Sequence, residues 1–311
     1  MKNSIIISTI VVTILAACNQ SQDNSTPKDN TQMDTASKST LPQTSHALTN
    51  YKTYLSQLDT FDINTVSKAA QAYQQQFKNT DANTRDSGYI LFNQHYETIE
   101  KNSNELHVKD TANYNALTPE NPTGKAGLPV KQQHYVESLH KNGFQLASAE
   151  GMTYIKPDLD VINSWFQPYI SPTFKEYLSQ LNKENKEGFA VDAGITISPK
   201  QYVDRVIWWE NFIKNNPSFI RLAEAKEKRK HLLTFLIQGM ENTPVRSYLD
   251  GSLEEYFKTA YTYLQNAYPN AESNQLVNPY YKALLQKDVA RADSLVKEYG
   301  SKGYITYIGE Q

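Results

Sequence analysis

Apolar and polar residues follow a helical period along most of the chain from about His46 onward. Apolar residues recur three and four positions apart, which places them on one face of a helix and predicts amphipathic helices. One such stripe consists of Tyr202, Val206, Trp209 and Ile213. The pattern predicts roughly nine or ten helices and an all-α fold. We expect an irregular, solenoid-like stack of helical hairpins with at most one small β-hairpin.

Two helix starts carry the residues of a capping box. Ser198 is followed by Pro199 at the first helical position and by Gln201 three residues on. This combination satisfies two free backbone N–H groups and places proline where a helix tolerates it. Ser252 and Glu255 have the same spacing and predict a second box. The helix expected there carries one apolar face, formed by Phe257, Ala260, Tyr261, Leu264 and Tyr268.

Further starts and breaks complete the pattern. Ser171 is expected to begin a helix that runs towards Lys186, and Asp62 to cap a helix through Phe77. Prolines and sparse apolar residues predict a long loop over 104–127. Weak alternation around a glycine predicts a hairpin over 144–155, and 190–197 is expected to hold a short strand.

Two segments can be superimposed at an offset of 52 residues. Phe212 and Leu264 each precede a proline by five residues, and Leu-Leu pairs follow each proline at equal distances. Each unit therefore predicts a helix, a proline break and a second helix, and such hairpins must stack to bury their apolar faces. The alternative is two unrelated helix pairs, each broken by a proline.

The turn sequences resemble those of a known helical family. The stretches WENFIKNNPSF and YLQNAYPNAES are similar to helix-turn units of tetratricopeptide-like bacterial envelope lipoproteins. The offset of 52 departs from that family's period of 34, which argues for a solenoid-like stack over a regular solenoid. Residues 150–245 also resemble a group of uncharacterised exported bacterial proteins, a resemblance that implies no activity.

The N-terminus has the pattern of a secretory signal. Lys2 precedes an apolar run from Ser4 to Leu15, and small residues lead to Cys18, the one cysteine of the chain. The run is shorter than the roughly 20 residues that a membrane-spanning helix needs. Leu15 to Cys18 resembles the lipobox of bacterial lipoproteins, which implies acylation of Cys18 and cleavage before it. Asn19 in place of Asp implies an outer-membrane lipoprotein; an ordinary signal peptide is the alternative.

The segment after the cysteine is a predicted tether. Residues 18–45 are polar and carry no aromatic side chain, so they lack the apolar surface needed to fold. A flexible chain of this length spans roughly 30 Å. The expected organisation is therefore a signal peptide at 1–17, a tether at 18–45 and a helical domain at 46–311, with a candidate division near 105–128.

Composition excludes several classes of function. Lipidation of Cys18 would leave no cysteine for disulfides or for a cysteine-based metal cluster. Without Lys2 the chain has 30 basic and 33 acidic residues and no basic domain, which argues against binding to nucleic acid.

The remaining motifs for catalysis or metal binding are incomplete, so we expect no cofactor and no metal, and favour a protein that is not an enzyme. The glycine-containing stretch 121–126 lacks the first glycine and the hydroxyl of a phosphate loop. Ser294 and Lys297 have Ser-x-x-Lys spacing but lie near the C-terminus. His134, Glu137 and His140 are spread around a helix, and a solvated surface explains them better than zinc. Two acids, Asp158 and Asp160, fit a helix cap better than a calcium loop.

Aromatic residues are the best candidates for recognition. The chain has 21 Tyr, 11 Phe and 3 Trp, and such rings suit interfaces and sugar stacking. We expect a partner surface that includes Trp165, Trp208, Tyr280 and Tyr281. The predicted function is that of a lipid-anchored envelope protein that binds another envelope protein or a peptide. A cell-wall or polysaccharide hydrolase, a glycan-binding lipoprotein and a structural spacer are the alternatives; a hydrolase requires two facing carboxylates in a pocket.

Overall fold

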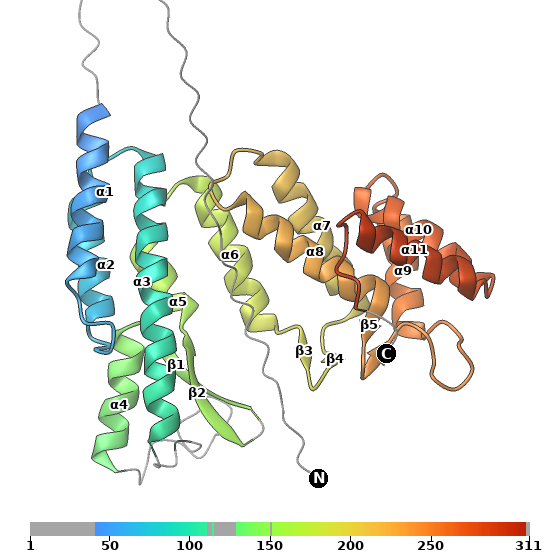
Figure 1. The fold of residues 1–311 in the computed structure, drawn as a ribbon, viewed down its shortest axis with the longest axis horizontal. Helices are drawn as coiled ribbons and strands as arrows, with labels where there is room; N and C mark the ends of the chain where they lie inside the picture. The colour runs from blue at the N-terminus through green and yellow to red at the C-terminus, as the bar shows by residue number, and fades with distance from the viewer. Residues whose placement is uncertain (1–40, 111–113, 115–128, 150, 309–311) are drawn as a thin grey trace, which may run out of the picture. The chain divides into compact units, whose positions relative to one another are not determined.

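The described part of the chain is mostly helical. The computed structural model describes residues 41–110, 114, 129–149 and 151–308, and in these ranges it contains eleven helices and three two-stranded antiparallel sheets (Figure 1). This confirms the predicted mostly helical fold. The helices are α1 (Leu41–Ser56), α2 (Thr65–Phe77), α3 (Ala82–Lys109), α4 (Val130–Lys141), α5 (Leu159–Phe166), α6 (Pro172–Glu187), α7 (Pro199–Asn215), α8 (Leu222–Gln238), α9 (Glu255–Ala267), α10 (Glu272–Leu285) and α11 (Val289–Ser301).

Three hairpins form in these ranges, so the expectation of at most one was wrong. The predicted hairpin consists of β1 (Phe144–Ala149) and β2 (Met152–Pro157). The second pairs β3 (Ala190–Val191) with β4 (Gly194–Ile195), and the third pairs β5 (Gly239–Met240) with β6 (Thr243–Pro244). The β3–β4 hairpin lies where a short strand was expected over 190–197. The sequence indicated no strand at β5–β6, because strands of two residues are too short to produce an alternating pattern.

The boundary of the helical region differs from the expected one. α1 begins at Leu41, inside the segment predicted to be tether, and the described residues from Leu41 onward belong to one compact unit. The predicted signal peptide, Cys18 and most of the tether lie outside the described residues. Most of the candidate division near 105–128 lies outside them too.

The first three helices pack through aromatic rings, with α1 and α2 both against α3 (Figure 1). Tyr51, Tyr73 and Phe77 are fully buried, and the rings of Tyr51 and Phe77 meet edge to face with centroids 5.3 Å apart. Gly88 of α3 makes room for the Phe77 ring, because a Cβ at this position would lie 2.7 Å from ring atom Cζ. The packing of this ring therefore depends on glycine inside a helix, where it otherwise weakens the helix.

Helix α3 is longer than the sequence predicted. The predicted loop began at residue 104, but α3 continues to Lys109. Asn104 donates from Nδ2 to the Ile155 carbonyl and accepts the Ile155 N–H at Oδ1, both at 2.8 Å. His107 is buried, with its ring nitrogens 3.1 Å from the Tyr135 hydroxyl and 2.9 Å from the Thr153 hydroxyl. These interactions with distant residues hold the last turns of α3 in place.

Three predicted helix starts are confirmed. The Ser198 hydroxyl accepts the Gln201 N–H while the Gln201 side chain accepts the Ser198 N–H, which is the predicted capping box. Ser171 caps α6, and Asp158 caps α5 by accepting the Val161 N–H at 3.2 Å.

Two predicted starts are wrong. Asp62 accepts hydrogen bonds from the backbone and side chain of Asn64, so it forms a turn and α2 begins only at Thr65. The Ser252 carbonyl accepts the Ser247 N–H across a loop, so Ser252 caps no helix and α9 begins at Glu255.

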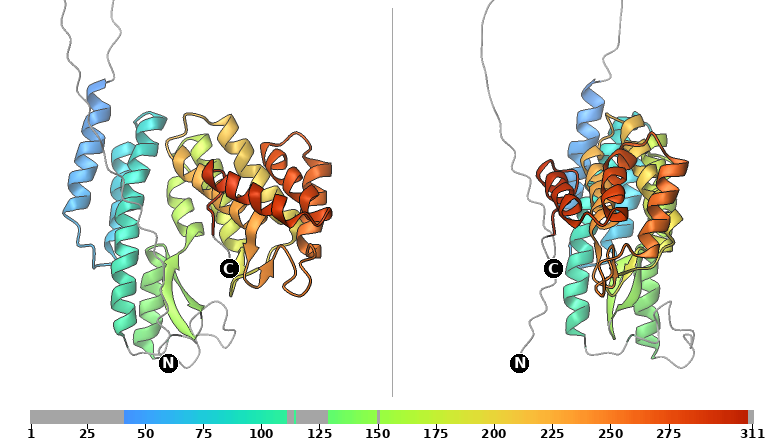
Figure 2. Two further views of the ribbon diagram at one scale, coloured as in Figure 1. Left: turned by 45° about the vertical axis from the view of Figure 1, so that its right-hand side comes forward. Right: turned by 90° about the vertical axis from the view of Figure 1, so that its right-hand side faces the viewer.

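The two segments related by 52 residues have matching backbone geometry. The C-cap residues that follow α7 and α9 are Asn216 and Tyr268, with φ, ψ of −127°, 58° and −133°, 54°. The N–H of each donates to the carbonyl four residues back, that of Phe212 or Leu264, and both of these residues are buried. A proline follows each turn and a helix follows each proline, which supports the repeat over a chance resemblance. Figure 2 shows the helices of this region from two further sides.

A second correspondence extends the repeat to the preceding helices. Trp209 of α7 donates from its indole nitrogen to Glu184 of α6, and Tyr261 of α9 donates to the Leu236 carbonyl of α8. Both donors and both acceptors are again 52 residues apart. Each aromatic residue therefore fastens its helix to the preceding one.

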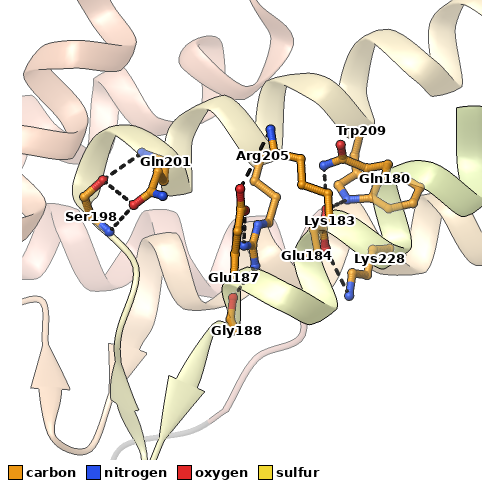
Figure 3. A network of polar contacts seen from close by, with 10 residues as sticks. All are labelled: Gln180, Lys183, Glu184, Glu187, Gly188, Ser198, Gln201, Arg205, Trp209 and Lys228. Carbon is orange, nitrogen blue, oxygen red and sulfur yellow. Dashed lines mark hydrogen bonds and ion pairs between the residues drawn. The ribbon is translucent and has the colours of Figure 1, made fainter. Parts of the chain in front are cut away.

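A buried network of charged residues joins α6, α7 and α8 (Figure 3). Glu184 accepts from Trp209 and from Gln180, and its second oxygen lies 3.3 Å from the Lys228 ammonium. Beside it, Arg205 pairs with Glu187 at 2.9 Å. Arg205 also donates to the carbonyl of Gly188, the residue that ends α6. Because these groups join one helix to the next, we assign the network to packing.

A second buried carboxylate joins α7 to the start of α10. Glu210 accepts the backbone N–H groups of Glu272 and Ser273 at 2.8 Å each, and also the Ser273 hydroxyl. Arg229 of α8 pairs with it at 3.0 Å. A carboxylate at a helix N-terminus receives N–H groups that have no partner within the helix.

In the described ranges, no helix is both long enough and apolar enough to cross a membrane.

Candidate functional site

The structure distributes the predicted partner residues over separate sites. Trp165 lies on α5, whereas Trp208 lies on α7 with its ring stacked on Phe212, and both indoles are partly buried. Tyr280 and Tyr281 are only 4% and 7% exposed. The Tyr281 hydroxyl lies 3.0 Å from that of Thr262 on α9. The helix that carries Tyr281 contacts both α9 and α11, so this ring belongs to the core and not to an exposed surface.

Tyr280, although buried, also lines a cavity. This cavity of about 510 Å³, which we call the C-terminal groove, lies between the end of α8, the β5–β6 hairpin, the loop that follows it, α10, α11 and the last described residues. Its volume is typical of pockets that hold small ligands. Its lining residues are Gln238, Gly239, Pro244, Val245, Arg246, Tyr248, Tyr280, Val289, Asp293, Val296, Lys297, Tyr307 and Ile308.

A second hollow, of about 630 Å³, is a weaker candidate. All its lining residues belong to α9, from Glu255 to Ala267. A hollow along one helix has no facing wall, so it offers few converging groups to a ligand.

One wall of the C-terminal groove depends on Gly239. This residue ends α8 with φ 74° and ψ −170°, a backbone conformation that is essentially restricted to glycine. A Cβ there would lie 2.8 Å from both the Thr243 carbonyl oxygen and the Val245 nitrogen. Gly239 thus lets the chain turn directly from helix to hairpin, which brings Val245 and Arg246 to the groove.

The loop between β6 and α9 is fixed by its own hydrogen bonds. Ser247 donates to the Ser252 carbonyl at 2.8 Å, and Gly251 donates back to the Ser247 carbonyl at 2.9 Å. The side chain of Asp250 accepts from both the backbone and the hydroxyl of Ser252. This ordered loop presents Tyr248 and Leu249, which are 73% and 97% exposed.

The lining of the groove combines a tyrosine with an ion pair. Arg246 Nη2 lies 3.1 Å from Asp293 Oδ1, and both side chains are partly exposed. Tyr280 is buried beside them. Burial raises the pKa of its hydroxyl, so the group is protonated and can donate a hydrogen bond.

The C-terminal segment contributes another part of the lining, next to the end of α8. The Gln238 side chain donates to the Thr306 carbonyl at 2.7 Å and accepts the Ile308 N–H at 2.9 Å. Ile305 is buried and anchors this segment. Tyr307 and Ile308 are thereby held at the rim, where both are partly exposed.

The rim is apolar and open to solvent. Tyr248, Val289, Tyr307 and Ile308 all line the groove and all expose more than a third of their surface. Clusters of exposed large apolar side chains around a hollow commonly mark interaction sites.

The hydrolase alternative and the metal candidates concern the acidic and histidine side chains of the described residues. The lining of the C-terminal groove includes one carboxylate, Asp293, whereas glycoside hydrolysis uses two facing carboxyl groups. Within the described ranges, no three His, Cys, Asp or Glu side chains come together as a metal site. Of the metal candidates, His140 lies 3.0 Å from the Asp158 carboxylate. The stretch 121–126 lies outside the described residues.

No protein-family model matches the chain, and comparisons with curated proteins and with solved structures find no significant match. The groove therefore has to be interpreted from its own geometry.

Sequence reasoning missed most of the groove. Arg246 and Asp293 lie 47 residues apart, and nothing in their spacing indicates that they pair. One signal was present: Tyr248 and Leu249 lie next to Asp250-Gly251, a turn sequence, so their side chains were candidates for exposure.

Proposed function

We propose that the chain is a lipid-anchored protein of the bacterial cell envelope whose helical domain binds a protein or peptide partner in the C-terminal groove. The observation that carries this proposal is the ordered loop that exposes Tyr248 and Leu249 at the edge of a hollow. Tyrosine is enriched at protein interfaces because its ring is apolar and its hydroxyl can stay hydrated. A preformed loop loses little conformational entropy on binding.

The anchor part of the proposal is supported by the sequence pattern at Leu15 to Cys18. Acyl chains contribute about 0.8 kcal/mol of membrane affinity per buried CH₂, and two or more chains make attachment stable. The domain itself would then need no membrane-spanning helix. A lipid-anchored protein diffuses along the membrane and meets partners that are confined to the same envelope.

Photocrosslinking in intact cells tests the binding site. A photoreactive phenylalanine analogue is placed at Tyr248 or Tyr307 and, as a matched control, at Phe61, an exposed aromatic residue between α1 and α2. We expect one protein to be crosslinked from both groove positions and not from Phe61. Equal crosslinking from all three positions, or none from the groove, would contradict the proposal.

Glycan binding is the alternative that the groove also favours. Tyr248 and Tyr307 could stack on sugar rings, and the Arg246–Asp293 pair could bind hydroxyl groups. Two results together would support this alternative. Soluble cell-wall fragments would protect the groove tyrosines from chemical modification, and photocrosslinking would capture no protein.

A further inference from the structure

We infer that the protein partner inserts a β-hairpin into the C-terminal groove, in the place of a hairpin that is missing between α10 and α11. This inference rests on the proposed function and specifies the structure of the segment that binds. It follows from the order of the elements, from the stacking of β3–β4 and β5–β6, and from the position of the groove.

The chain twice joins two helices through a glycine and a hairpin. α6 ends at Gly188 and α8 ends at Gly239, and the two glycines have nearly the same backbone angles. The hairpins β3–β4 and β5–β6 lead from these glycines to α7 and α9. The offset of 52 residues relates α8 in turn to α10, but the turn over residues 286–288 joins α10 directly to α11. The third connection therefore lacks a hairpin.

The two hairpins stack on each other through hydrogen bonds to backbone groups (Figure 1). Asn242 donates from its backbone N–H to the Ala193 carbonyl at 3.0 Å, and from its side-chain amide to the Asp192 carbonyl at 2.6 Å. The Thr243 hydroxyl accepts the Ile195 N–H at 2.9 Å. One face of β5–β6 is thus occupied by the preceding hairpin.

The other face of β5–β6 belongs to the groove. Successive residues of a strand point to opposite faces, so Thr243 and Pro244 lie on different sides of the hairpin. Thr243 binds β4, whereas Pro244 and Val245 line the groove. Val289, the first residue of α11, lines it as well. The interface by which one hairpin stacks on the next therefore continues into the groove, next to the connection where the hairpin is missing.

The groove also offers the polar groups that a peptide backbone needs. The Arg246 guanidinium donates hydrogen bonds and the Asp293 carboxylate accepts them, and these side chains are 35% and 42% exposed. A backbone carries N–H donors and C=O acceptors together, so an ion pair of zero net charge suits it. Apolar side chains of the hairpin would pack against Pro244, Val289 and Val296.

The exposed rim favours a partner as the occupant. Stacked repeats usually end in a unit with a polar outer face. The groove instead leaves Tyr248, Val289 and Tyr307 73%, 46% and 43% exposed. A hairpin supplied by the partner would cover these side chains, as a further hairpin of the chain itself would have done.

The segment of the partner that enters the groove can be identified directly. The protein captured by the photoreactive analogue at Tyr307 is digested, and mass spectrometry locates the crosslinked residue. This segment is synthesised as a linear peptide and as a backbone-cyclised hairpin, and fluorescence anisotropy gives the affinity of each for the full chain. We expect the cyclic form to bind about tenfold more tightly, because its bound conformation is already formed.

A grafted hairpin gives a second test that needs no partner. Residues 286–288 are replaced by a copy of residues 239–245, which begins with the glycine that turns α8 into its hairpin. A Gly-Ser linker of equal length at the same place is the matched control. Tetranitromethane nitrates exposed tyrosines. We expect nitration of Tyr248 and Tyr307 to be lost in the graft and retained in the control.

The outcomes separate this inference from the proposed function. Equal affinity of the linear and cyclic peptides, or a crosslink to a helix or to a second copy of this chain, overturns the inference and leaves the groove as a binding site. A graft that folds by circular dichroism but leaves both tyrosines as reactive as in the control also overturns it; if the graft does not fold, the peptide comparison decides. Failure to capture any protein contradicts the proposed function and the inference together.

Discussion

Gly239 is the residue on which the shape of the C-terminal groove depends most directly. Two helices of the described chain end in glycine with nearly the same backbone angles, φ 70°, ψ −174° at Gly188 and φ 74°, ψ −170° at Gly239. The space around them differs. A Cβ at Gly188 would meet only the Thr196 hydroxyl, at 3.8 Å, whereas one at Gly239 would collide with backbone atoms at 2.8 Å.

Gly239→Ala should therefore destabilise the protein more than Gly188→Ala does. Both substitutions add backbone strain of about 1–3 kcal/mol. Only Gly239→Ala adds overpacking, which costs about 1–3 kcal/mol more. Urea unfolding of the two variants measures the difference, and equal losses of stability would show that the hairpin adjusts without cost.

Glu210 makes stability depend on pH in the acidic range. Burial opposes its ionisation, but the hydrogen bonds from Ser273 and the charge of Arg229 outweigh burial and lower the pKa of Glu210 below 4.5. The folded state therefore holds this proton less tightly than the unfolded state. The stabilisation is present above pH 4.5 and is lost as the pH falls through the lower pKa of the folded state.

Glu210→Gln should lower the free energy of unfolding at pH 7 by about 1–3 kcal/mol, because charged hydrogen bonds to the start of α10 are weakened. The deficit should shrink as the pH falls below 4.5. Chemical denaturation at a series of acidic and neutral pH values measures it. Glu272→Gln is the control, since Glu272 is largely exposed and lies 3.5 Å from Arg229. A deficit that does not change with pH would contradict the role of the Glu210 charge.

Among the secondary structure elements, α3 shows how a side chain can extend a helix into a stretch that looks like a loop. The amide of Asn104 binds the backbone of Ile155 through two hydrogen bonds and fixes the hairpin β1–β2 to the helix. Asn104→Ala should cost about 2–4 kcal/mol, because it leaves backbone groups of β2 without partners. Asn93→Ala, at a partly exposed position of α3 bonded to Glu97, is the matched control.

Thermal unfolding of the two asparagine variants gives this comparison. Hydrogen exchange at Ile155 should also accelerate in Asn104→Ala and stay unchanged in Asn93→Ala. Equal melting temperatures would mean that packing alone holds the hairpin.

The elements that the sequence predicted well are those fixed by local chemistry. The capping box at Ser198 and Gln201 needs only residues three positions apart, and the structure contains it. Ser252 has the same local pattern, but its backbone pairs with Ser247 to close a loop, and that competing hydrogen bond prevents a cap. The groove was beyond sequence reasoning for a similar reason, because Arg246 and Asp293 meet only after α10 and α11 have folded.

At the scale of the whole molecule, the repeat and the groove lie in the same part of the chain. The offset of 52 relates α7 to α9 and matches the turns at Asn216 and Tyr268. The groove involves helices of both repeat units, since it lies where α8 and α10 meet α11 and the C-terminal segment. The predicted anchor lies at the opposite end of the sequence, at Cys18.

The lipid anchor gives a prediction of its own. Cells that express the chain should incorporate labelled palmitate into it, and Cys18→Ser should abolish the label and release the protein from membranes. Both effects follow because the thiol is the acceptor that the lipobox resemblance implies. Unchanged fractionation of Cys18→Ser would contradict the anchor.

The most direct test of the account compares how much partner copurifies with the protein when its exposed side chains are changed. Tyr248→Ala combined with Leu249→Ala removes the two exposed side chains of the loop at the edge of the groove, and Phe61→Ala removes an exposed ring elsewhere. Quantitative mass spectrometry of copurified proteins should show one partner depleted at least tenfold by the groove variant and unchanged by Phe61→Ala. A partner recovered equally with both variants would contradict the claim that the C-terminal groove is the binding site.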